Sequence, residues 1–342
     1  MGKVKIVLVG PRGYNGGCVR LRAVTDFLVS ENYQVKVYHY NDVPIKSRLV
    51  YTAQQIFGNT TLDERVVAEL EDKIKKEVPD VIIAIGYMDI VLRDFDCLKI
   101  FFCEAPATDE NYFALAHRST AKGYDLEYIK ELREREINAF NKADYVVFPW
   151  ECYEEYVRRY VYENDNLLTI RFGCTPQQNA VSFFFPPSIV YLGALGRYWN
   201  NMELLSHLSS ITPNVIDVYG SPDPARKYNL RYKGIAPTLD VLNNYQFGLN
   251  TVSKDILRQN AFSSKILDYL SYGLPCLFPE WQRFPHELKG CVSYNEDNFV
   301  EVLEKYSEKS EWQKLSQEAI EQARELSWDK TLQPLLKLIE SR

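Results

Sequence analysis

Short apolar runs alternate with amphipathic segments of helical length along almost the whole chain, and this alternation constrains the fold most. The runs Val4 to Val9, Val81 to Ile85 and Leu98 to Phe102 are rich in β-branched and aromatic residues and carry few charges. Strands read this way when helices cover both faces of a parallel sheet. The sequence therefore predicts an α/β chain.

The alternation is interrupted once and then starts again. Between Thr175 and Ser188, three prolines, two glutamines and an asparagine fit neither the strand nor the helix period, so we place a linker there. Strand-like runs resume at Ile189 to Leu192, and 342 residues are about two domains long. We predict two doubly wound, Rossmann-like domains over residues 1–180 and 181–326, and a C-terminal helix over 327–342 that crosses back to the first.

Charge and cysteine content exclude several classes of protein. The 40 basic and 46 acidic residues give a net charge of −6, without the positive excess that nucleic-acid binding requires. The apolar run Val81 to Leu92 is too short to span a bilayer, and the N-terminus lacks a signal-peptide pattern. We therefore expect a cytoplasmic protein with at most peripheral membrane contact. Seven cysteines without Cys-x-x-Cys spacing and four unpaired histidines argue against a zinc site or a disulfide framework.

The loop after the first strand is rich in glycine. Ligands of open parallel sheets bind beyond the carboxyl ends of the strands, so this loop, Gly10 to Gly17, is a candidate for holding an acceptor or a phosphate group. It is neither the dinucleotide-binding fingerprint nor a P-loop. A long turn explains the glycines equally well. The candidate residues are Arg12, Asn15, Gly16 and Gly17.

The most informative segment is residues 260 to 275, NAFSSKILDYLSYGLP. It predicts a helix of two to three turns, with a serine as N-cap, Gly273 just past its end and a proline two residues later. Lys265 and Asp268 are spaced i, i+3 and can address one patch at the start of that helix. Helix amides and an ammonium suit a diphosphate, and a carboxylate can accept ribose hydroxyls. The structural alternative is an ordinary capped helix with a surface ion pair.

Residues 264 to 275 resemble the donor-binding segment of glycosyltransferases with the GT-B fold. Ile189 to Gly193 resembles the opening strand of their donor domain, and Tyr232 to Ile235 resembles a later element. The resemblance implies two Rossmann-like domains that face a central cleft. It also implies a nucleotide-sugar donor, with UDP as the most common nucleotide.

The resemblance implies a set of donor-binding residues. In glycosyltransferase family 4, two glutamates separated by seven residues contact the donor sugar and the ribose, and Asn260 and Asp268 stand at those places here. A lysine that the family uses on the pyrophosphate falls among Asn200 and Asn201, so Lys265, Arg197 or Arg258 has to supply the positive charge. The donor-binding candidates are Gly193, Arg197, Tyr232, Asn260, Ser263, Ser264, Lys265 and Asp268.

Catalytic candidates come from the segment after the strand Leu98 to Phe102. A carboxylate there can act as the base for an acceptor hydroxyl, or as a polar group near the anomeric carbon. Glu104 is the first candidate, and Asp109 and His117 follow it. Asp94-Phe-Asp96 spells the metal-binding Asp-x-Asp of GT-A enzymes, but it precedes a strand. We interpret it as a solvated turn and expect no metal dependence.

These features predict a metal-independent glycosyltransferase. It moves a sugar from a nucleotide-diphosphate donor, a UDP-sugar, to a glycan, a lipid-linked or a small-molecule acceptor. The nucleotide sugar is a co-substrate, no cofactor is expected, and nucleic acid is not a partner. A nucleotide-sugar epimerase is one alternative, because that chemistry also uses two Rossmann-like halves. A catalytically inactive binding subunit is another, because Asn260 replaces a carboxylate.

Overall fold

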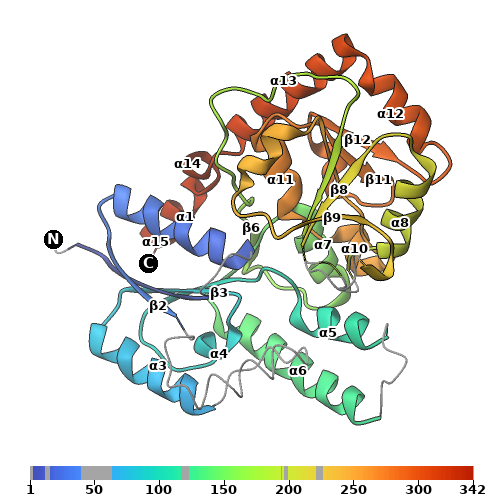
Figure 1. The fold of residues 1–342 in the computed structure, drawn as a ribbon. Helices are drawn as coiled ribbons and strands as arrows, with labels where there is room; N and C mark the ends of the chain where they lie inside the picture. The colour runs from blue at the N-terminus through green and yellow to red at the C-terminus, as the bar shows by residue number, and fades with distance from the viewer. Residues whose placement is uncertain are drawn as a thin grey trace. The chain divides into compact units, whose positions relative to one another are not determined.

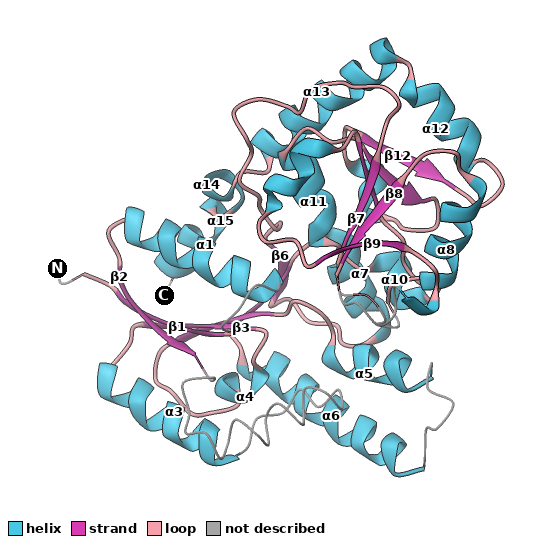
Figure 2. Ribbon diagram, viewed as in Figure 1, coloured by secondary structure: helices cyan, strands magenta, loops and turns pink. Residues whose placement is uncertain are grey.

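The chain folds into two compact units. The computed structural model describes residues 3–11, 16–39, 64–116, 123–193, 195, 199–220 and 226–341. The first unit is Met1–Phe172 with Thr331–Arg342, and the second is Gly173–Lys330. Each unit contains a six-stranded parallel sheet with helices on both faces (Figure 2). The predicted α/β class with two doubly wound sheets is confirmed.

The first unit is built on the sheet β2-β1-β3-β4-β5-β6. Its strands are β1 (Lys5–Gly10), β2 (Gln34–His39), β3 (Val81–Ile85), β4 (Leu98–Phe102), β5 (Tyr145–Phe148) and β6 (Leu167–Thr169). Its described helices are α1 (Gly16–Ser30), α3 (Glu64–Glu77), α4 (Met88–Val91), α5 (Ala107–Ala116), α6 (Gly123–Lys142), α7 (Glu151–Tyr160) and α15 (Gln333–Glu340).

The strand order of the first sheet reverses between β1 and β3. Every residue of β3 is buried, and Ile6 of β1 pairs with Val81 of β3. The crossovers from β1 to β2 and from β2 to β3 run in opposite directions. Because parallel crossovers are right-handed, α1 lies on one face of the sheet and α3 on the other (Figure 1).

The second unit is built on the sheet β12-β11-β10-β7-β8-β9. Its strands are β7 (Ile189–Leu192), β8 (Ile216–Tyr219), β9 (Arg231–Gly234), β10 (Phe247–Leu249), β11 (Cys276–Pro279) and β12 (Cys291–Tyr294). Its described helices are α8 (Met202–Ile211), the 3-10 helix η2 (Leu239–Asn244), α10 (Ile256–Asn260), α11 (Ser264–Ser271), the 3-10 helix η3 (Phe284–Glu287), α12 (Phe299–Ser307) and α13 (Lys309–Glu325). The short helix α14 (Trp328–Thr331) ends where the chain returns to the first unit.

The second sheet reverses its strand order between β7 and β10. Phe247 of β10 pairs with Ile189 of β7 at this switch point. Helices α8 and α11 lie on opposite faces of the sheet (Figure 2). Leu205 of α8, Phe247 and Trp312 of α13 belong to one buried apolar cluster. Helices α8 and α13 are therefore fixed to the sheet by a shared core, which positions the loops at its carboxyl edge.

The units divide between Phe172 and Gly173, and not after residue 180 as expected from the sequence. The segment that follows is held to the second unit by backbone hydrogen bonds. Among them, the Gln177 amide donates to the Ser271 carbonyl at 2.8 Å, and the Val181 amide donates to the Tyr272 carbonyl at 3.0 Å. Its prolines and amides break both sequence periods because it is an extended strap, and not because it is a free linker.

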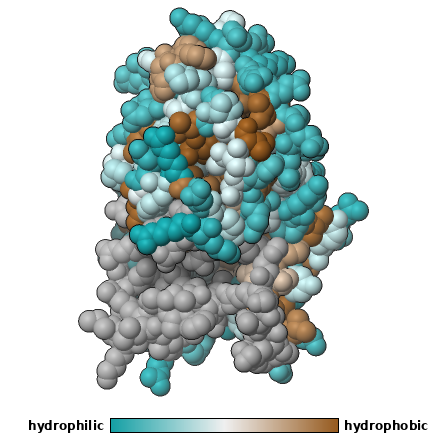
Figure 3. Space-filling model, turned by 45° about the vertical axis from the view of Figure 1, so that its right-hand side comes forward, coloured by the Kyte–Doolittle hydropathy of each residue, from teal (hydrophilic) through white to brown (hydrophobic). Residues whose placement is uncertain are grey.

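The chain leaves the second unit after Lys330, and not at residue 326. Helix α15 then buries Leu335 and Ile339, and the Ser341 hydroxyl lies 3.1 Å from that of Tyr145. None of the described helices is long and apolar enough to cross a lipid bilayer. On the face shown in Figure 3, apolar side chains form separate patches among hydrophilic ones, which is common on folded proteins.

Candidate functional site

Helix α11 ends as its sequence predicts. Gly273 has a φ of +70°, and its amide donates to the Leu270 carbonyl at 2.9 Å. The Leu274 amide donates to the Tyr269 carbonyl at 3.0 Å. These two bonds form a Schellman motif, which needs a residue that tolerates a positive φ. The predicted role of Gly273 is confirmed.

The start of α11 is not capped by a side chain. Ser263 occupies the N-cap position, as the sequence predicts, but its side chain accepts no capping hydrogen bond. Ser264 is the first helical residue. The first amides of a helix have no acceptor within it, and they attract anions. The serine side chain therefore does not compete with an anionic ligand for these amides.

The side chain of Lys265 reaches back from α11 to the end of β7. Its Nζ lies 4.4 Å from the ring centre of Tyr191, donates to the Tyr191 hydroxyl at 3.1 Å, and donates to Oδ1 of Asn200 at 3.3 Å. A Cβ atom on Gly193 would lie 3.0 Å from Nζ. Burial lowers the pKa of Lys265 to about 8, because desolvation disfavours the charged form.

Helix α11 is seated on the switch point of the second sheet. The Tyr269 hydroxyl accepts from the Leu192 amide at 2.9 Å and donates to the Leu249 carbonyl at 3.1 Å. Leu192 ends β7 and Leu249 ends β10. Ligands of doubly wound sheets bind at such a point, outside the carboxyl ends of the strands. Lys265 therefore lies where this architecture places a ligand.

Asp268 lies near Lys265 on the same helix and is partly exposed. Among the described residues, no side chain donates a hydrogen bond to its carboxylate. Burial raises the pKa of Asp268 to about 7, and the charge of Lys265 opposes that rise. The carboxylate therefore keeps its acceptor capacity for a ligand hydroxyl.

Two more candidates are Gly193, which directly follows β7, and Tyr232, which lies within β9. A Cβ atom on Gly220 would lie 2.8 Å from Cγ of Leu195 and would overlap the carbonyl of Gly193, so these turns touch. The Tyr232 hydroxyl donates to the Gly220 carbonyl at 2.8 Å. The structure thus links Tyr232 to the Gly193 turn through Gly220.

Asn260 is used by the protein itself. Its side chain is 5% exposed, and its Nδ2 donates to the Ile256 carbonyl at 2.7 Å. Its Oδ1 accepts from the Arg283 guanidinium at 2.7 Å. Both ends of the amide therefore have partners within the protein, and a sugar hydroxyl would have to compete with them.

A second buried cation lies near Asn200. The guanidinium of Arg258 is 5.5 Å from the ring centre of Trp199, the residue before Asn200, and Arg258 is 8% exposed. Arg258 and Lys265 thus both approach the turn at Trp199 and Asn200. The third cation named from the sequence, Arg197, lies outside the described residues.

In the first unit, Glu104 follows β4 and is ion-paired. Its carboxylate lies 3.3 Å from the guanidinium of Arg20, which is fully buried and sits 4.5 Å from the ring centre of Phe102. Burial raises the pKa of Glu104, and Arg20 opposes that rise. Glu104 therefore neutralises a buried cation and keeps a partly exposed carboxylate at the carboxyl edge of the sheet.

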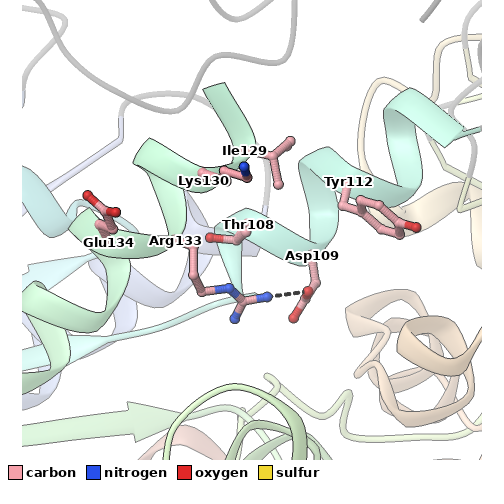
Figure 4. A pocket seen from close by; sticks show the side chains of 7 residues that line it. All are labelled: Thr108, Asp109, Tyr112, Ile129, Lys130, Arg133 and Glu134. Atoms are coloured by element: carbon pink, nitrogen blue, oxygen red, sulfur yellow. Dashed lines mark hydrogen bonds and ion pairs between the residues drawn. The ribbon is translucent and has the colours of Figure 1, made fainter. Parts of the chain in front are cut away.

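Asp109 lies in the first turn of helix α5, in the segment after β4. The Arg133 guanidinium donates to its carboxylate at 2.6 Å (Figure 4). Behind this pair, burial raises the pKa of Glu136 to about 7. The pair borders an open pocket of about 510 Å³, lined by Thr108, Asp109, Tyr112, Ile129, Lys130, Arg133 and Glu134.

Several other predicted residues can be placed only in part. Gly16 and Gly17 begin α1, directly beyond the loop that follows β1. Arg12, Asn15 and His117 lie outside the described residues. Asp94, from the Asp-x-Asp sequence, lies in an exposed turn before β4 and pairs with Lys142 at 2.9 Å. In the described part of the chain, no group of three His, Cys, Asp or Glu could hold a metal ion.

Comparison with solved structures shows the architecture. No protein-family model and no curated protein matches the chain. Sucrose-phosphate synthase from Thermosynechococcus elongatus superimposes with a TM-score of 0.74 at 13% identity, over 99% of both chains. Anabaena HepE in complex with UDP and glucose gives a TM-score of 0.67 at 11% identity, over 99% of this chain and 100% of that one. The galactosyltransferase WaaB gives 0.64 at 14% identity, over 99% of both.

The chain has the GT-B fold. The resemblance seen in residues 264 to 275 is thereby confirmed for the fold. Two residues that hold the Lys265 ammonium were not predicted from the sequence as candidates, namely Tyr191 and Asn200. For Asn200 there was a signal, because it stands near the place of a family lysine. For Tyr191 there was no such signal, because a tyrosine inside a buried strand is interpreted as a core residue.

Proposed function

We propose that this chain is a glycosyltransferase that moves a sugar from a UDP-sugar to a hydroxyl acceptor without a metal ion. The observation that supports this most is the position of Lys265. Its ammonium lies beside Gly193 at the switch point of the second sheet, near the uncapped start of α11. These groups offer positive charge and amide donors to a pyrophosphate. Asp268 can accept the ribose hydroxyls.

A solved structure with the same fold supports UDP as the nucleotide part of the donor. The HepE structure holds UDP and glucose, and it superimposes on this chain over its full length. The second unit is then the donor-binding half, as the fold-level likeness of residues 264 to 275 suggests.

The reaction breaks the bond between the anomeric carbon and the β-phosphate oxygen. The bonding electrons go to that oxygen, so UDP leaves with added negative charge, and the acceptor oxygen forms the new bond to the anomeric carbon. The acceptor proton passes to a base. Donors that are already aimed at the developing charge lower the barrier, and we assign this task to Lys265 and the first amides of α11.

The first unit supplies the acceptor side in this proposal. Glu104 and Asp109 remain the candidates for the base, and burial raises the pKa of each. A raised pKa brings a carboxylate nearer to the value that general-base catalysis at neutral pH favours. Each also has an arginine partner, Arg20 or Arg133, that fixes its orientation.

Titration with UDP tests the donor assignment directly. UDP at 100 times its dissociation constant should stabilise the fold by about 2.7 kcal/mol, seen as a rise in Tm. The same rise should appear in EDTA, because no metal takes part. ADP at the same concentration is the control that shows whether the site selects uracil over adenine. A chain whose Tm does not respond to UDP, or responds only when a divalent cation is added, contradicts the proposal.

UDP affinity should fall as the pH rises through the pKa of Lys265. The ammonium is charged below about pH 8, and at pH 9 about nine-tenths of the side chains are neutral. We expect UDP binding to be about tenfold weaker at pH 9 than at pH 7, measured by calorimetry. In Lys265→Arg the cation stays charged over this range, so its binding should be nearly independent of pH. An equal decline in both proteins would assign the titration to another group.

A second function is favoured by one observation. Asn260 stands where the family has a carboxylate, and its side-chain amide is hydrogen-bonded to the Ile256 carbonyl and to the Arg283 guanidinium. A donor-binding subunit without catalytic activity would show this pattern. Slow hydrolysis of a UDP-sugar by the purified chain separates the two functions, because only a catalytic site releases UDP. Binding of the UDP-sugar without any release would favour the inactive subunit.

A further inference from the structure

Two cysteines face each other across neighbouring strands of the second sheet. Cys276 begins β11 and Cys291 begins β12, and the two are register partners in a parallel pair. Of the seven cysteines, only these two lie in strands of the described sheets. Register partners point to the same face, and neighbouring strands lie about 4.8 Å apart. This spacing falls within the range of Cα separations that a disulfide bridges.

The side chains of the pair are in contact. A side-chain interaction with Cys291 adds to the raised pKa of Cys276, which places the two sulfur atoms close together. Both are free thiols in this structure. A disulfide between directly paired strands is a demanding geometry, and demanding disulfides are the more easily reduced ones. The pair is therefore suited to reversible oxidation and not to permanent cross-linking.

The two thiols differ in access to solvent. Cys276 is fully buried, whereas Cys291 is partly exposed, because β12 is the edge strand of its sheet. Burial raises the pKa of Cys276 well above its usual value, and the nearby Lys265 opposes that rise. An oxidant from solution thus reaches Cys291 first. Cys276 is placed to attack only a sulfur that is already in contact with it.

We propose that Cys276 and Cys291 are a reversible oxidation site that forms a disulfide in the presence of a peroxide. The Cys291 thiol attacks one oxygen of hydrogen peroxide, the O–O bond breaks, and one water leaves as Cys291 becomes a sulfenic acid. The Cys276 sulfur then attacks the Cys291 sulfur, the S–O bond breaks, and a second water leaves. Two thiols are oxidised by two electrons, and the peroxide is reduced to two waters. This site does not depend on sugar transfer.

Peptide mapping of the whole chain tests the site. The reduced protein is treated with hydrogen peroxide, the remaining thiols are alkylated under denaturing conditions, and the protein is digested with trypsin. Cys276 falls in the peptide 266–283 and Cys291 in the peptide 290–305, each with a single cysteine. We expect these two peptides to be joined, five of the seven cysteines to be alkylated, and dithiothreitol to restore the count to seven.

Two variants serve as controls. Cys291→Ser should abolish the joined peptide and leave Cys276 as a thiol, because Cys276 is then out of reach of the oxidant. Cys97→Ser removes the other partly exposed cysteine and should leave the joined peptide unchanged. A thermal melt establishes that each variant is folded. The proposal is overturned if Cys291 in the folded wild type is oxidised to a sulfinic or sulfonic acid without joining Cys276, or if neither thiol reacts.

Discussion

Lys265→Ala is expected to lower kcat/KM for sugar transfer by about 100-fold or more, which is the typical effect of removing one donor that stabilises a developing negative charge. Tyr191 and Asn200 hold the Lys265 ammonium at the end of β7, so alanine removes the cation that these two contacts fix there. Steady-state assays with a UDP-sugar measure the loss. Calorimetry with UDP separates weaker binding from slower chemistry.

Lys289→Ala is the matched control for that variant. Lys289 lies in the same unit, is exposed, and pairs with Glu325 at 3.6 Å. Exposed pairs of this kind contribute little to stability, so this variant should keep its activity. Lys265→Ala should also stay folded, because burial already disfavours the charged form of Lys265. Full turnover in Lys265→Ala would remove the central support of the transferase proposal.

Gly248→Ala should destabilise the second unit by about 1–3 kcal/mol or more, the usual cost of overpacking a core. Gly248 lies in β10, and the ring of Tyr269 from α11 packs directly on it. A Cβ atom on Gly248 would lie 2.7 Å from Cδ1 of Tyr269 and would overlap two further ring atoms. The ring is fixed by the two hydrogen bonds of its hydroxyl, so α11 has to move. A thermal or urea melt measures the loss, and weaker UDP binding should accompany it.

A double-mutant cycle shows whether the ring is the cause. In a Tyr269→Ala background the added methyl group of Gly248→Ala has room, so its cost should largely vanish. Gly10→Ala is the comparison in the first sheet, where the new Cβ would meet the methyl carbons of Leu21 at 3.0 and 3.2 Å. We expect the smaller loss there. Equal losses at the two glycines would argue against the special role of Tyr269.

The elements that could be predicted are those specified by their own residues. The strand β3 was expected over Val81 to Ile85 and is found there, because a buried parallel strand is a continuous apolar run. The end of α11 was expected at Gly273, because a positive φ favours glycine. In both cases, the signal lies within a few residues of the feature.

The features that could not be predicted depend on distant partners. Lys265 contacts Tyr191 and Asn200, which are 74 and 65 residues away in the sequence. Asn260 was expected to bind a sugar, but it accepts a hydrogen bond from Arg283. The residues around Asn260 contain no pattern that predicts this contact. Helix α5 was missed because Ala107 to Ala116 lacks an apolar stripe.

The return of the chain at Thr331 has a consequence for any attempt to take the protein apart. The first unit consists of two pieces of sequence, and the second is inserted between them. A protease that cuts the chain near residue 173 leaves the two units covalently connected at residue 331. A cut near residue 331 leaves them connected at residue 173. A gene fragment that stops at Phe172 omits the buried Leu335 and Ile339 of α15. A circular permutation that joins residue 342 to residue 1 and opens the chain at Gly173 would instead keep each half continuous.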